Sequence, residues 1–166
     1  FQRLALTDAL SELVDGFKSS LNFRDLQIME LLFYCHLSNR DVAKIIGLRE
    51  QAIALIKHRS LKQIRERVGA FRIPAGPSSE DFESLLTDIW ELGRFSCPKR
   101  STIGAFLLGT LDTKWHQYVD FHVNTLGCRF CRANLDDLQT QNAQNRSTRF
   151  RTRIMESTAG FLQKSL

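Results

Sequence analysis

The segment of residues 37–59, LSNRDVAKIIGLREQAIALIKHR, constrains the fold more than any other part of the chain. Ser38 can cap a first helix, because a serine hydroxyl can accept a hydrogen bond from an unpaired amide of the first turn. The apolar side of the helix is expected to carry Val42, Ile45 and Ile46. Gly47 then ends this helix, since glycine tolerates the left-handed conformation that is common at a helix C-terminus. A second helix begins near Arg49. The segment therefore predicts two helices joined by a tight glycine turn.

The second helix of this pair is apolar on one side and basic on the other. From Arg49 to Arg72 the chain has seven Lys or Arg and two Glu, an excess of five positive charges that equals the excess of the whole chain. This segregation of charge favours DNA binding, in which phosphate contacts supply affinity and base contacts supply discrimination. A basic helix surface that is only solvated remains the alternative interpretation.

The helix that precedes this pair, NFRDLQIMELLFYCHL, has an apolar stripe at helical spacing. Over residues 20–68 the sequence resembles region 4 of bacterial sigma factors of the extracytoplasmic-function type, in which a similar segment precedes a recognition helix with a His-Arg pair. His58 and Arg59 stand where that pair would fall. The resemblance implies a helix-turn-helix that binds promoter DNA and RNA polymerase core.

Three apolar residues, Ala54, Leu55 and Ile56, occupy positions early in the recognition helix where many sigma factors carry polar or basic side chains. Base and phosphate contacts are therefore expected from the polar residues on either side of them. The candidate DNA-contacting residues are Arg49, Gln51, Lys57, His58, Arg59 and Lys62.

A second group of residues has the composition of a metal site. Cys128 and Cys131 form a Cys-x-x-Cys pair that can chelate one ion, His122 lies six residues before the first of them, and Cys97 can complete a tetrahedron. Thiolate and imidazole ligands suit zinc, and four protein ligands leave no coordination position for water. We therefore expect a structural Zn²⁺ ion.

Residues 97–138 resemble the zinc-binding anti-sigma domain, which combines an early ligand with a late His and a Cys-x-x-Cys motif. Five residues, VNTLG, separate His122 from Cys128, whereas this family usually has fewer. His116 is therefore the alternative histidine ligand. A redox-active Cys pair and small buried thiols are the two alternatives to metal binding. Cys35, alone on a predicted core helix, is expected to serve in packing.

The segment after Val68, GAFRIPAGPSSED, is rich in Gly, Pro and Ser and interrupts the helical pattern. We therefore expect an all-α protein in which a helix-turn-helix module is followed by a small helical zinc-binding module. Its expected parts are a sigma region 4-like domain at 1–68, a linker at 69–79, an anti-sigma-like domain at 80–140 and a basic tail at 141–166. The tail is interpreted either as a mobile arm or as a last helix capped by Ser147.

Several classes of protein fit the sequence poorly. The chain of 166 residues contains no apolar run near the roughly 20 residues of a membrane span, and it has no apolar signal core at its start. It also lacks a Gly-rich phosphate loop and a Ser/His/Asp grouping. We expect a cytoplasmic protein that is not an enzyme and that binds no membrane. Because it begins at Phe1, we expect a fragment or a processed form.

The combination of the two resemblances implies a sigma-like transcription initiation protein that its own anti-sigma-like module regulates. The acidic helix expected within residues 80–91 would dock on the basic face in competition with DNA, and the metal or thiol state of the second module would bias this docking. A docking surface made of opposite charges should weaken as salt rises. The alternative is a scaffold that binds another transcription regulator without switching.

Overall fold

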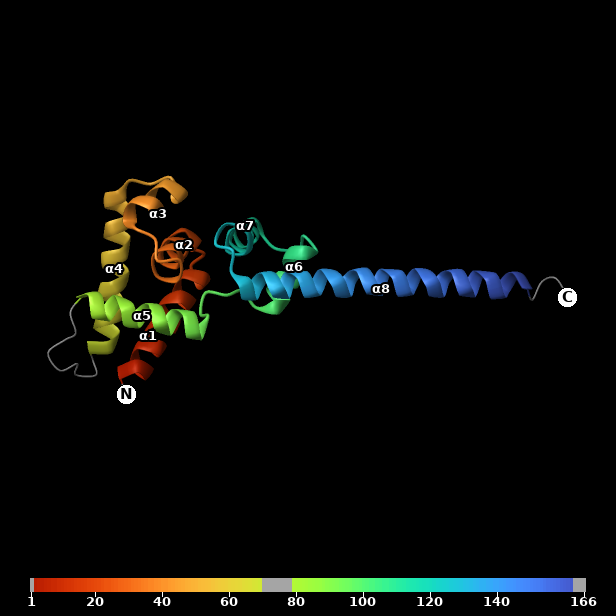
Figure 1. Cartoon of the computed structure of the whole chain (residues 1–166), viewed down its shortest axis with the longest axis horizontal. Helices are drawn as coiled ribbons and strands as arrows, with labels where there is room; N and C mark the ends of the chain where they lie inside the picture. The colour runs from red at the N-terminus through yellow and green to blue at the C-terminus, as the bar shows by residue number, and fades with distance from the viewer. Residues whose placement is uncertain (1, 70–78, 163–166) are drawn as a thin grey trace.

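The computed structural model describes residues 2–69 and 79–162, and these residues form helices and no strand, which confirms the predicted all-α fold (Figure 1). The helices are α1 (Gln2–Ser19), α2 (Phe23–Met29), α3 (Asn39–Ile46), α4 (Glu50–Gly69), α5 (Ser79–Gly93), α6 (Arg100–Leu107), α7 (Thr113–Asp120) and α8 (Arg129–Leu162). Two π-helical turns, η1 (Glu30–Tyr34) and η2 (Phe121–Thr125), directly continue α2 and α7. Most of the predicted linker at 69–79 lies outside the described residues.

Helices α3 and α4 meet at the glycine turn that the sequence predicts. The Ser38 hydroxyl caps α3 by accepting a hydrogen bond from the Asp41 amide at 3.2 Å. Gly47 has a φ of 76°, and its amide donates to the Ala43 carbonyl at 2.9 Å. This left-handed conformation ends α3 and would strain a residue with a Cβ. The predicted cap at Ser38 and the predicted helix end at Gly47 are both confirmed.

One large apolar core joins α1 to α5 and η1. Helix α1 packs against α4 and α5, and α5 packs against η1. Fully buried side chains of this core include Leu10, Leu26, Ile28, Ile53, Ile64, Leu86 and Trp90. Helices on either side of residues 70–78 therefore contribute to the same core.

The contact between α5 and the N-terminal helices is mainly apolar. Its buried side chains are Phe82, Leu86, Ile89 and Trp90. Lys57 Nζ and Glu83 Oε2 form an ion pair at 2.7 Å beside this contact. His36 and Glu91 form a more exposed pair at 3.2 Å. Because most of the buried surface is apolar, salt screening should weaken this contact much less than the sequence predicts for an electrostatic one.

A smaller core lies among α6, α7, η2 and α8. Its buried members are Ile103, Val119, Val123, Cys128 and Cys131. Tyr34, Trp115 and Leu126 are half-buried and pack against both cores. The Phe23 ring of α2 lies 4.6 Å from the Tyr118 ring and 4.8 Å from the Trp115 ring, both of α7. Aromatic contacts therefore join the two cores.

The last helix, α8, has 34 residues and extends away from the rest of the protein (Figure 1). At a rise of 1.5 Å per residue, its length is about 50 Å. Arg100 of α6 holds the first turns of α8, because its guanidinium donates to Asn134 Oδ1 at 2.9 Å and pairs with Asp137.

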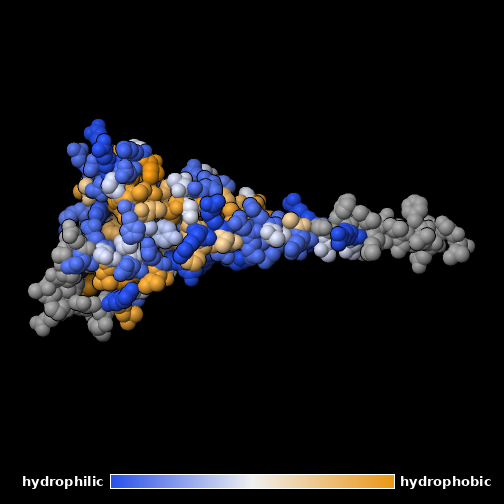
Figure 2. Space-filling model, viewed as in Figure 1, coloured by the Kyte–Doolittle hydropathy of each residue, from blue (hydrophilic) through white to orange (hydrophobic). Residues whose placement is uncertain are grey.

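From Gln139 onward, every described side chain of α8 is exposed, and Figure 2 shows a largely hydrophilic surface there. The predicted tail at 141–166 continues this helix as far as Leu162, and residues 163–166 lie outside the described part of the chain. The interpretation of a separate helix capped by Ser147 is wrong, because the helix begins at Arg129 and Ser147 lies inside it.

Because α5 contributes to the larger core, its buried residues should contribute to the stability of the whole fold. We expect Leu86→Ala, at a fully buried position, to lower the free energy of unfolding by about 2–5 kcal/mol. Leu92→Ala is the matched control on the same helix, since Leu92 is 73% exposed and should change the free energy of unfolding by less than about 0.5 kcal/mol. Urea unfolding followed by circular dichroism measures both. Equal stabilities of the two variants would show that α5 does not share the core.

Candidate functional site

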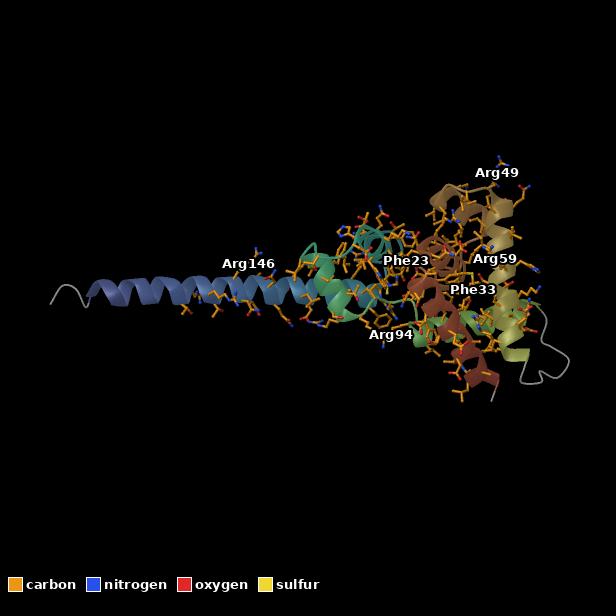
Figure 3. The ribbon with its side chains drawn as sticks, turned by 180° about the vertical axis from the view of Figure 1, so that it is seen from behind. Phe23, Phe33, Arg49, Arg59, Arg94 and Arg146 are labelled. Carbon is orange, nitrogen blue, oxygen red and sulfur yellow. The ribbon has the colours of Figure 1, made fainter. Side chains whose placement is uncertain are left out.

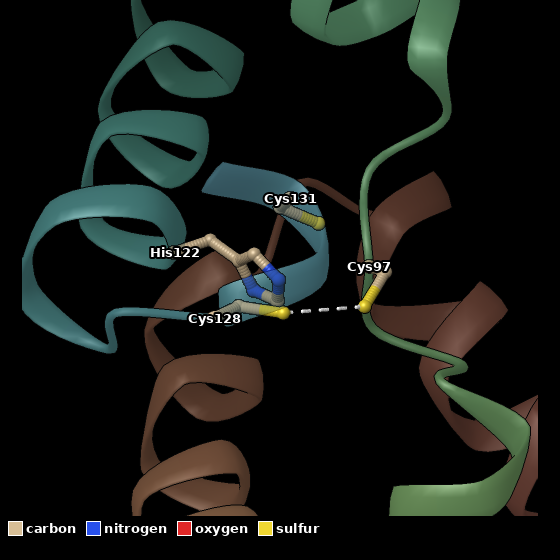
Figure 4. Close-up of side chains that lie close together, drawn as sticks. All are labelled: Cys97, His122, Cys128 and Cys131. Carbon is tan, nitrogen blue, oxygen red and sulfur yellow. Dashed lines mark hydrogen bonds between the residues drawn. The ribbon is translucent and has the colours of Figure 1, made fainter. Parts of the chain in front are cut away.

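The structure brings the four predicted metal ligands together at the junction of the two cores (Figure 4). One ligand atom from each of Cys97, His122, Cys128 and Cys131 lies within 4.8 Å of all the others. Cys97 comes from the segment between α5 and α6, and His122 comes from η2. Cys128 directly precedes α8, and Cys131 lies in its first turn. Three segments of the chain thus meet in a cluster that could hold a metal ion.

The π-turn and the glycine after it bring His122 to the cluster despite the long VNTLG gap. In η2 the Leu126 amide donates to the Phe121 carbonyl at 2.8 Å. The Cys128 amide then donates to the His122 carbonyl at 3.2 Å, and Gly127 between them has a φ of 70°. This wider turn with a left-handed exit folds the chain back, so that Cys128 lies beside His122.

The alternative histidine, His116, lies outside the cluster. It is exposed on α7, and its ring lies 4.7 Å from the ring of Phe106. His122, in contrast, is 1% exposed and lies among the sulfurs. The geometry therefore favours His122 as the histidine of the site.

The two nitrogens of the His122 ring have different surroundings. Nδ1 lies 2.8 Å from Oε1 of Glu30, a carboxylate that is completely buried. Nε2 is also buried, and it has no hydrogen-bond partner in the described structure. Glu30 can only accept from Nδ1–H when it is ionised, and the Nε2 lone pair then remains available. An orphaned imidazole nitrogen beside three sulfurs is what a metal ligand requires.

The electrostatics of the cluster favour a thiolate at Cys128. Thiol hydrogen bonds from Cys131 and Cys97 lower the pKa of Cys128, although its burial acts in the opposite direction. The same contact with Cys128 raises the pKa of Cys131. Burial opposes protonation of His122, but the Cys128 and Cys97 sulfurs and the Glu30 carboxylate outweigh it and raise the His122 pKa to about 11. These directions favour a Cys128 thiolate beside a protonated His122, so a metal bound at Nε2 would take the place of that proton.

Three residues around the ligands were not predicted from the sequence. The Tyr118 hydroxyl lies 3.0 Å from Glu30 Oε1 and 2.6 Å from the Ser96 carbonyl oxygen, and the Tyr34 hydroxyl donates to Cys128 Sγ at 3.8 Å. Burial and the adjacent Glu30 raise the pKa of Tyr118, so its hydroxyl stays protonated. The burial of Glu30 had one signal in the sequence. This acidic residue lies at helical spacing from Leu26 and Phe33, on an otherwise apolar stripe.

The six candidate DNA-contacting residues lie in two different environments. Gln51, His58 and Lys62 are exposed along α4. Arg49, the residue before that helix, is exposed as well, and Figure 3 shows it extending from the start of α4. Lys57 is half-buried against Glu83. Arg59 Nη2 lies 3.2 Å from Oδ2 of the buried Asp25. Neither ion pair has a local signal in the sequence, since Glu83 and Asp25 come from other helices.

Helix α4 also exposes an apolar residue among these polar ones. Leu55 is 63% exposed, whereas the next residue, Ile56, is buried. Gln51, Leu55, His58 and Lys62 follow one another at intervals of three or four residues and therefore share one side of the helix. We call these four residues the open face of α4.

Comparisons with models of protein families, with curated proteins and with solved structures find no match for this chain. Within residues 2–69 and 79–162, no helix has both the length and the apolar character that a membrane span requires.

Proposed function

We propose that this chain is a sigma-factor-like transcription initiation protein whose helix-turn-helix binds promoter DNA and whose metal-binding module regulates it in cis. The observation that carries this proposal is the open face of α4, held in place by the Ser38 cap and the left-handed Gly47. An exposed helix side that follows a tight turn fits the major groove of DNA. RNA polymerase core is a proposed partner through the resemblance of residues 20–68 to sigma region 4.

Each residue near the open face has a proposed role. Arg49 and Lys62 would contact phosphates, because they are exposed cations at separate points along α4. Gln51 and His58 would reach base edges in the major groove. Leu55, as an exposed apolar side chain between them, would contact a thymine methyl group.

The proposed occupant of the Cys97, His122, Cys128 and Cys131 cluster is a structural zinc ion. Three thiolates and one imidazole form a ligand set typical of closed zinc sites, and the orphaned Nε2 of His122 supports it. When bound, zinc would supply four bonds that hold three chain segments together. The smaller core has few buried members and would gain most of its stability from these bonds.

The proposed regulation acts through α5. Glu83 engages Lys57 on the side of α4, so one positive charge of that helix is withdrawn from DNA. A non-switching scaffold that binds another transcription regulator is the alternative function. The apolar burial of Leu86 and Trp90 favours this alternative, because a helix held by a core does not readily dissociate.

Removing one ligand should empty the metal site. We expect the purified reduced protein to contain about one zinc ion per chain and Cys128→Ser to lose it, because three ligands hold zinc far less tightly than four. Cys35→Ser is the matched control, since Cys35 is not a member of the cluster. Elemental analysis of the three proteins measures this. A folded wild-type chain without metal would contradict the site and leave redox or packing roles for its cysteines.

The exposed cations of α4 should set the salt dependence of DNA binding. Arg49→Ala and Lys62→Ala should each weaken binding and reduce the slope of log affinity against log salt by about one, because each removes one phosphate contact. Lys114→Ala, an exposed lysine on α7, is the control and should leave the slope unchanged. Fluorescence anisotropy with duplex DNA across a salt series provides the slopes. The same slope in all variants would argue against this DNA-binding surface.

Release of Lys57 tests regulation through α5. We expect Glu83→Gln to strengthen DNA binding and to steepen the salt slope by about one, because Lys57 gains a phosphate contact. Glu91→Gln changes the net charge equally on the same helix, but Glu91 pairs with His36 and not with α4. The same anisotropy titration compares the two variants. Identical binding by both would favour the scaffold.

A further inference from the structure

The metal cluster draws its four ligands from residues 97–131, but two groups that hold those ligands come from η1 in the N-terminal half. Glu30 accepts a hydrogen bond from His122 at 2.8 Å, and Tyr34 donates to Cys128 at 3.8 Å. Glu30 and His122 are 92 positions apart in the sequence. The site is therefore completed by a part of the fold that supplies no ligand.

Burial of the Glu30 carboxylate costs free energy unless specific contacts offset it. Its side chain is 0% exposed, and a buried carboxylate requires strong hydrogen bonds or a counter-charge. Oε1 lies within hydrogen-bond distance of His122 Nδ1 and the Tyr118 hydroxyl, whereas Oε2 has no hydrogen-bond partner in the described structure. The Oε1 atom of Glu30 thus holds the His122 ring in one orientation. A carboxylate that accepts from the outer nitrogen of a histidine fixes its tautomer and strengthens the inner nitrogen as a ligand.

We propose that Glu30 is a positioning residue for the metal centre, and that metal binding is thereby coupled to the packing of η2 and α8 on η1. This inference rests on the proposed metal site. If Nε2 of His122 held a metal, the ring would be polarised and Nδ1–H would be a better donor to Glu30. Metal binding and the packing of η2 and α8 on η1 are then coupled equilibria, and such coupling is reciprocal. The packed arrangement should raise metal affinity, and bound metal should stabilise the packed arrangement.

The coupling has a short route to the helix-turn-helix. Leu37 follows η1, and its amide donates to the Leu31 carbonyl at 3.0 Å. Ser38, the next residue, is the N-cap of α3. Only residues 35–38 separate η1 from α3, so a loss of order in η1 would also disturb the N-terminus of α3. Metal occupancy would in this way regulate the helix pair proposed to bind DNA.

The test measures metal affinity in Glu30 variants of the full chain. Co²⁺ serves as the probe, because its absorption reports thiolate ligation and coordination geometry, and a chromogenic chelator competes for the metal. Glu30→Ala removes the acceptor and should weaken Co²⁺ binding about 10- to 100-fold. Glu30→Gln keeps an acceptor without the charge, so its loss should be smaller. The Co²⁺ spectrum of Glu30→Gln should keep the thiolate bands if the four ligands are intact.

Asp25→Asn is the matched control. Asp25 is a buried carboxylate of α2 that pairs with Arg59 and Arg24 and is not a member of the cluster. Its removal should lower stability and leave Co²⁺ affinity within about twofold of the wild type. This control separates a loss of metal affinity that follows general destabilisation from one that follows the loss of the Glu30 contact.

Hydrogen exchange provides the second readout. In the wild type, metal should slow amide exchange in residues 23–37, which contribute no ligand, and this protection should shrink in Glu30→Ala. Unchanged Co²⁺ affinity in both Glu30 variants would overturn the inference while leaving the metal site intact. Metal protection confined to residues 97–131 would overturn it as well. An absence of thiolate-to-Co²⁺ bands in the wild type would overturn both the inference and the metal site.

Discussion

The hydrogen bond between Glu30 and His122 is the contact on which the arrangement of the two halves depends. Both side chains are buried, and each would be strongly destabilising without the other, since neither can reach water. Around them, Phe23, Tyr118 and Trp115 join the two cores through ring contacts. The smaller core alone buries few apolar side chains, so it is too small to fix the cluster geometry unaided. Its order depends on the contacts with the larger core.

Both partners of this contact lie in π-helical turns, Glu30 in η1 and His122 in η2. In η1 the Cys35 amide donates to the Glu30 carbonyl, and in η2 the Leu126 amide donates to the Phe121 carbonyl, so each turn is one residue wider than an α-helical turn. Each turn exits through a left-handed residue, His36 with a φ of 55° or Gly127 with a φ of 70°. The left-handed conformation costs energy at a non-glycine residue such as His36, and the surrounding packing must offset that cost. Each widened turn thus supplies one partner of the contact between Glu30 and His122.

Local signals in the sequence predicted much of this structure, and the contacts between distant segments account for the rest. Ser38 and Gly47 act on their own backbone neighbours, so their roles can be read without tertiary information. The Cys-x-x-Cys pair likewise fixes its own spacing, and it identified the Cys/His cluster that could hold a metal ion. The role of Glu30 could not be predicted, because its partner lies on a segment with no local relation to it. The packing of α5 in the larger core could not be predicted for the same reason. An amphipathic pattern shows that a helix packs against a partner, but it does not identify that partner.

The same distinction limits which basic residues can serve the proposed DNA complex. For Arg59 to contact a phosphate, it would have to leave Asp25, a carboxylate that is 4% exposed and whose Oδ1 already lacks a hydrogen-bond partner in the described structure. Without Arg59, the buried Asp25 would keep only Arg24, whose Nε lies 3.8 Å from Oδ1, whereas a phosphate contact at the surface is screened by solvent. Arg59 is therefore better suited to holding α4 against α2 than to binding DNA. In the proposed complex, the open face and Arg49 then carry the interaction, with Lys57 added only when Glu83 releases it.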